Sequence, residues 1–84
     1  MRLSIEDHRQ LCFIIASSIA ENGMPPTIRE IAEEMGLSEQ STATVQYRLL
    51  RAETAGYLSR KSDKARAIRL TDAGRALVAD AAAL

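Results

Sequence analysis

The segment from Gly23 to Gly36 constrains the fold more than any other part of this chain. Gly23 suits the left-handed conformation that ends a helix, and the Pro25–Pro26 pair cannot continue that helix. Thr27, followed three residues later by Glu30, forms a capping box for a new helix, which Gly36 closes after about two turns. A short helix, a glycine turn and a longer helix form the helix-turn-helix pattern, which is typical of nucleic-acid-binding proteins.

The hydrophobic pattern predicts the remaining elements of the chain. In order, we expect a helix from the Ser4 cap to about Asn22, helices over 28–35 and within 39–55, a strand over 57–62, a turn at 63–64, a strand over 66–70, and a helix over 72–83. The predicted fold class is therefore mainly α with a small antiparallel β-ribbon, a winged helix-turn-helix with a three-helix core, a two-stranded wing and an extra C-terminal helix. We expect residues 1–70 to form the winged domain, and 71–84 to pack on it or to form a dimer contact.

The charge of the chain is balanced overall but unevenly distributed. The 84 residues carry 11 basic and 11 acidic side chains, so the formal net charge is zero. Residues 1–38 contain three basic and six acidic side chains, whereas residues 39–75 contain eight basic and four acidic ones. This polarity allows a basic face for nucleic acid on a neutral protein, although small proteins also show such asymmetry by chance.

Several classes of function lack the residues that they need. The only histidine, His8, lies on the apolar face of the first predicted helix, where we expect it to pack in the core, and the only cysteine, Cys12, is expected there too. No metal-ligand spacing and no glycine-rich phosphate loop are present, so we expect no enzyme activity, cofactor, metal or small-molecule ligand. Without a membrane-spanning run or signal peptide, the chain is expected in the cytoplasm, associated with the nucleoid.

The polar side chains of the third predicted helix and of the wing are the candidates for DNA contact. Arginine can bond a guanine edge with two hydrogen bonds, glutamine can bond an adenine edge, and basic wing residues can neutralise phosphates. The candidates for base contact are Gln40, Ser41, Thr44, Gln46, Tyr47, Arg48 and Arg51. The candidates for backbone contact are Thr27, Arg29, Ser38, Arg60, Lys61, Lys64 and Arg66. Alternatively, Arg48 and Arg51 pair with Glu39 or Glu53 on a solvated helix.

Residues 1–70 resemble the N-terminal DNA-binding domain of LexA-type repressors. The segments that carry the resemblance are Gly-Met-Pro-Pro-Thr at 23–27, Glu-Ile-Ala at 30–32, Gly-Leu at 36–37, Val-Gln-Tyr-Arg-Leu at 45–49, Gly-Tyr-Leu at 56–58 and Arg-Ala-Ile-Arg-Leu at 66–70. Residues 70–77 are similar to the segment after the wing of MarR-like regulators. The resemblance implies a dimeric, sequence-specific repressor whose helix 39–55 enters the major groove of double-stranded DNA while the wing, 57–70, touches the backbone. The family's peptidase domain is expected to be absent.

Two departures from the family pattern affect the third helix. The stretch between Leu37 and Val45 is about two residues longer than the family usually has, at the end where base contacts normally lie, so we do not expect the family's operator to carry over. Ala43, Tyr47, Leu50 and Thr54 also form a second, partly apolar stripe. This stripe favours an alternative function, a winged-helix module that binds a regulator or another protein. The C-terminal helix is expected to cover Phe13 or Ile14, within one chain or across a dimer.

Overall fold

Four helices and a two-stranded antiparallel ribbon make up the computed structural model over the residues that it describes, 3–38, 42–60 and 67–82. The elements are α1 (Ile5–Asn22), α2 (Ile28–Glu34), α3 (Thr42–Thr54), β1 (Leu58–Arg60), β2 (Ile68–Leu70) and α4 (Asp72–Ala82). This arrangement confirms the predicted winged helix-turn-helix. Among the described residues, β1 begins one residue later and β2 two residues later than expected, whereas the predicted end of the first strand, the turn at 63–64 and the start of the third helix at 39–41 lie outside them.

The elbow between α1 and α2 has the local structure that its sequence predicts. Gly23 adopts a left-handed conformation (φ 77°) and donates its N–H to the Ile19 carbonyl, which ends α1. Thr27 and Glu30 form the predicted capping box: the Glu30 N–H donates to the Thr27 hydroxyl at 3.1 Å, and the Thr27 N–H donates to the Glu30 carboxylate at 2.8 Å. A second capping box, formed by Ser4 and Asp7, begins α1. Local chemistry therefore fixes where both helices start.

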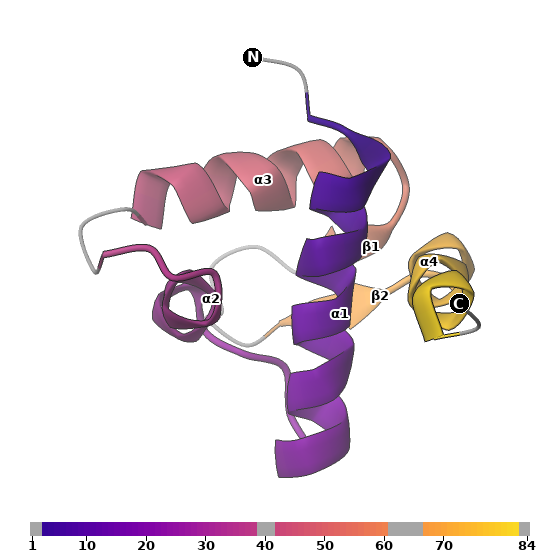
Figure 1. Ribbon diagram of the computed structural model, residues 1–84, viewed down its shortest axis with the longest axis horizontal. Helices are drawn as coiled ribbons and strands as arrows, with labels where there is room; N and C mark the ends of the chain where they lie inside the picture. Colours follow the sequence, from indigo (N-terminus) through magenta and orange to yellow (C-terminus); the bar gives the residue numbers. More distant parts are fainter. Residues whose placement is uncertain (1–2, 39–41, 61–66, 83–84) are drawn as a thin grey trace.

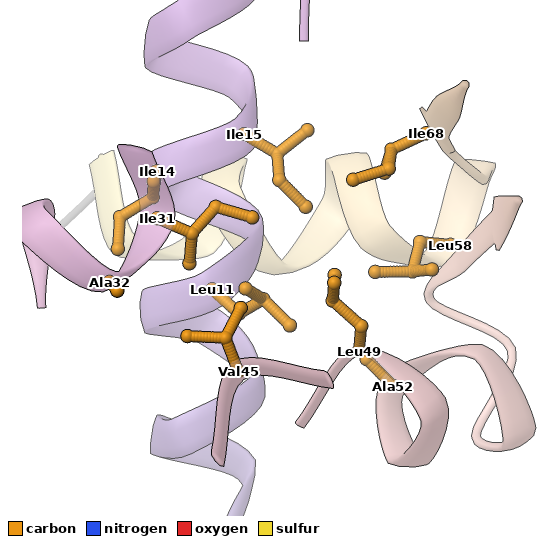
Figure 2. Close-up of a cluster of buried hydrophobic side chains, with 10 residues drawn as sticks. All are labelled: Leu11, Ile14, Ile15, Ile31, Ala32, Val45, Leu49, Ala52, Leu58 and Ile68. Carbon is orange, nitrogen blue, oxygen red and sulfur yellow. The ribbon is translucent and has the colours of Figure 1, made fainter. Parts of the chain in front are cut away.

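The core lies where α1 meets α2, α3 and the ribbon. Figure 1 shows α1 upright between α2 and α4, with α3 crossing the N-terminal half of α1. Side chains from five elements gather in the cluster drawn in Figure 2, which consists of Leu11, Ile14, Ile15, Ile31, Ala32, Val45, Leu49, Ala52, Leu58 and Ile68. Because these side chains leave water together, the burial of the inner face of α3 fixes the direction of its outer face.

The ribbon and α4 are joined at one compact junction. Leu58 pairs with Leu70, and Arg60 pairs with Ile68. The Tyr57 carbonyl accepts a hydrogen bond from the Thr71 N–H at 3.1 Å, while the Thr71 hydroxyl caps α4. α4 then packs on α1, where Arg9 Nε donates to the Leu77 carbonyl at 3.3 Å.

Two expectations about side-chain packing within one chain are wrong, whereas coverage of Phe13 across a dimer stays a prediction. α4 does not cover Phe13, which remains 54% exposed, because Arg9 and Leu77 place α4 against a different face of α1. Ile14 is buried, but it lies beside Ile31 of α2 (Figure 2). His8 was expected in the core but is only half-buried. The centroid of its ring lies 5.3 Å from the centroid of the Tyr57 ring.

Candidate nucleic-acid interface

α3 presents two chemically different faces. Val45, Leu49 and Ala52 are buried against the other elements, as their spacing predicts. The opposite face is exposed to solvent and carries Ala43, Thr44, Gln46, Tyr47, Leu50, Arg51 and Thr54. Four predicted base-contact residues, Thr44, Gln46, Tyr47 and Arg51, therefore lie together on a single exposed helix surface. Their use as base contacts stays a prediction, as does that of Gln40 and Ser41, which lie outside the described residues.

The residues directly after α2 end that helix, and the core then joins α2 to α3. Gly36 is left-handed (φ 73°), and the Leu37 N–H returns to the Ala32 carbonyl at 2.8 Å, which closes α2. Ile31 and Ala32 then lie beside Val45 in the core, as Figure 2 shows. α2 therefore packs against the buried face of α3 and leaves the outer face of α3 uncovered.

Arg48 occupies a different environment from Arg51. Its guanidinium lies 3.9 Å from the Asp7 carboxylate at the start of α1, and its side chain is only 24% exposed. Hydrogen bonds from the Ser4 backbone and hydroxyl, helped by the Arg48 charge, lower the pKa of the Asp7 carboxyl. The sequence alternative placed Glu39 or Glu53 opposite Arg48, whereas its described partner is Asp7. Arg48 thus links α3 to the N-terminal cap of α1.

The predicted backbone contacts fall on three regions. Arg29 and Ser38 are exposed on α2 and just after it, and the Thr27 hydroxyl accepts the capping hydrogen bond. Arg60 of β1 lies 3.4 Å from Glu53 of α3, so this arginine joins the ribbon to the end of α3. The other predicted wing contacts, Lys61, Lys64 and Arg66, lie outside the described residues.

One exposed basic side chain escaped the sequence prediction. Arg69 lies in β2 opposite Ser59 and is exposed, between the inward-facing Ile68 and the partly buried Leu70. The alternation of Ile68 and Leu70 on one face was visible in the sequence, and it places Arg69 on the other face. Arg69 therefore joins the candidates for phosphate contact.

The described residues also bear on other kinds of site. No group of three or more metal-ligating side chains occurs among them, and none of their helices is long and apolar enough to cross a membrane. Cys12 is fully buried, and burial raises the pKa of its thiol to about 11. The thiol is therefore protonated at neutral pH and weakly nucleophilic.

Comparisons with known proteins agree with this geometry. The family model described as LexA DNA binding domain matches residues 5–67. A LexA repressor of Lactobacillus delbrueckii subsp. bulgaricus is 40% identical over 74 residues, which cover 86% of this chain and 35% of that protein. The LexA repressor of Carboxydothermus hydrogenoformans is 43% identical over 72 residues, covering 83% and 34% respectively. The chain thus spans about a third of the length of these relatives.

Proposed function

The chain belongs to the family of LexA DNA-binding domains, and from this premise we propose that it is a sequence-specific transcriptional regulator that binds double-stranded DNA as a repressor. The observation that carries the proposal is the exposed outer face of α3, which combines hydrogen-bonding and basic side chains on a helix supported by α1 and α2. An α-helix, about 10–12 Å across with its side chains, fits the major groove of B-DNA, which is about 12 Å wide.

In the proposed complex, α3 reads bases and its surroundings bind phosphates. Gln46 and Arg51 are exposed; the Gln46 amide can donate to and accept from an adenine edge, and the Arg51 guanidinium can donate to a guanine edge. Arg29 on α2 and Arg69 on the ribbon are exposed and offer positive charge. Together with the wing residues Lys61, Lys64 and Arg66, they would neutralise phosphates without reading sequence.

The test is selection from a randomised duplex library with the purified protein at two salt concentrations. We expect one enriched motif at both concentrations and weaker total binding at the higher one, because phosphate contacts release counterions. Lys64→Ala should weaken binding to every duplex and reduce the salt dependence, whereas Arg51→Ala should relax the motif. Selection without enrichment would refute sequence-specific binding and favour the alternative, a protein-binding module, to which the exposed Leu50 also points.

We propose further that the protein acts as a homodimer through α4, in the cytoplasm at the nucleoid of a prokaryote or phage. Ala76 and Ala79 are exposed on α4, so a second copy can approach its backbone closely. Two half-sites would then lie about 34 Å apart or a multiple of that distance. Sedimentation of the wild type and of Ala79→Arg tests this arrangement: a dimer that the variant converts to monomer is expected, and a monomeric wild type contradicts it.

A further inference from the structure

Two of the six exposed large apolar side chains in the described part of the protein lie on α3, on its outer face. Leu50 is 51% exposed and Tyr47 is 39% exposed. Together with Ala43 and Thr54 they recur at spacings of four, three and four residues, which places them along one line of the helix. We call these four residues the outer stripe of α3.

The outer stripe lies outside the hydrophobic core of the described residues. Its members lie opposite Val45 and Leu49, the side chains that α3 buries, so they add little to the core. The Thr54 hydroxyl donates to the Leu50 carbonyl at 2.9 Å, so its proton is used inside the helix. The stripe therefore offers mainly carbon surface, between the polar side chains of Gln46 and Arg51.

The chemistry of the major groove contains one apolar group, the C5-methyl group of thymine. A narrow carbon stripe flanked by hydrogen-bonding side chains matches a groove in which thymine methyl groups alternate with polar base edges. A protein partner fits less well, because a specific interface buries about 800 Å² on each side, far more than two half-exposed side chains supply. We infer that Leu50 and Tyr47 contact thymine methyl groups and thereby require thymines at defined positions of the half-site. This inference rests on the proposed DNA binding.

Uracil substitution tests the inference, because uracil keeps the hydrogen-bonding edge of thymine and lacks only the methyl group. The probe is the duplex most enriched by the wild-type protein in the selection above, with one thymine at a time replaced by uracil. At one or two positions we expect the wild-type Kd, measured by fluorescence anisotropy, to rise about fourfold, the effect of losing one buried methyl group. At one of those positions Leu50→Ala should bind the thymine and uracil duplexes equally.

The control variant is Phe13→Ala, which removes another exposed apolar side chain, on α1. It should retain the full thymine preference, and thermal melting should show that both variants are folded. Failure of the wild type to enrich any motif would overturn the proposed function together with this inference. An enriched motif whose uracil duplexes bind as tightly as the thymine duplexes would overturn this inference alone, as would an unchanged preference in Leu50→Ala. Either of those results would leave the outer stripe to a protein partner.

Discussion

Gly74 lies in the first turn of α4, where the helix passes directly over the backbone of Tyr57. A Cβ atom added at this position would lie 2.0 Å from the Tyr57 carbonyl oxygen and 3.1 Å from its carbonyl carbon. Ordinary contacts of a Cβ atom begin near 3.4 Å. Because the atoms in the way belong to the backbone of Tyr57, no side-chain rotation can relieve the clash, and alanine at position 74 requires the backbone to move. We therefore predict that Gly74→Ala destabilises the protein.

The size of the effect follows from one stabilising and two destabilising contributions. Alanine is favoured over glycine in a helix by about 1 kcal/mol, which opposes the effect. Overpacking at a tight contact costs about 1–3 kcal/mol. Movement of α4 would also lengthen the hydrogen bond from the Thr71 N–H to the Tyr57 carbonyl, now 3.1 Å, which contributes about 0.5–1.5 kcal/mol. The expected net loss is about 1–3 kcal/mol, or about 4–8 °C of melting temperature for each kcal/mol.

Urea unfolding followed by helical circular dichroism measures this loss. The matched control is Ala73→Gly, the reverse exchange at an exposed position in the first turn of the same helix, which should cost up to about 1 kcal/mol through helix propensity alone. Both substitutions should lower the free energy of unfolding, although one replaces glycine with alanine and the other alanine with glycine. If Gly74→Ala were as stable as the wild type or more stable, the close approach of α4 to Tyr57 would be refuted.

Three further predictions concern the interface, the elbow and the thiol. Arg51→Ala should weaken binding to the selected duplex by about 1–3 kcal/mol, and Arg48→Ala by less, because Arg48 faces Asp7; an anisotropy titration that reverses this order contradicts the assignment. Thr27→Ala should cost about 1 kcal/mol in urea unfolding while Thr27→Ser retains most of the stability, and equal losses would exclude a capping role. Because burial raises the pKa of Cys12 from 9.0 to about 11, the native state holds this proton more tightly than the unfolded state. Stability should therefore fall between pH 9 and 11, and Cys12→Ala should fall less; identical pH profiles of the two urea midpoints would disprove the coupling.

Features set by residues close in the sequence could be predicted with their boundaries. The Thr27–Glu30 capping box and the left-handed Gly23 need only neighbours three or four residues away, and both were found as expected. The inner face of α3 was predictable for the same reason, since helical periodicity alone selects Val45 and Leu49.

Features set by the packing of distant elements could not be predicted. Within one chain, α4 was expected to cover Phe13 or Ile14, yet the position of α4 depends on the junction with Tyr57 and on the contact between Arg9 and Leu77, which join residues far apart in the sequence. The pairing of Arg48 with Asp7 is equally non-local, and its partner could not be chosen among several carboxylates before the helices were placed.

The ion pairs around α3 change how its arginines should be interpreted. Asp7 of α1 faces Arg48 near the middle of α3, and Arg60 of β1 faces Glu53 at its end. These arginines, both predicted to contact DNA, connect α3 to its neighbours on two sides and so help to fix its orientation. Ion pairs near the surface contribute little to stability, so we expect the main effect of these two partly exposed pairs to be on position rather than on folding free energy. In the proposed complex, recognition would then depend on the side chains that remain on the outer face, where Arg51 and Gln46 offer polar groups and Leu50 offers carbon surface. Because Asp7 and Glu53 hold the other two arginines, fewer charges would remain for phosphates, and discrimination between DNA sequences would rest on that face.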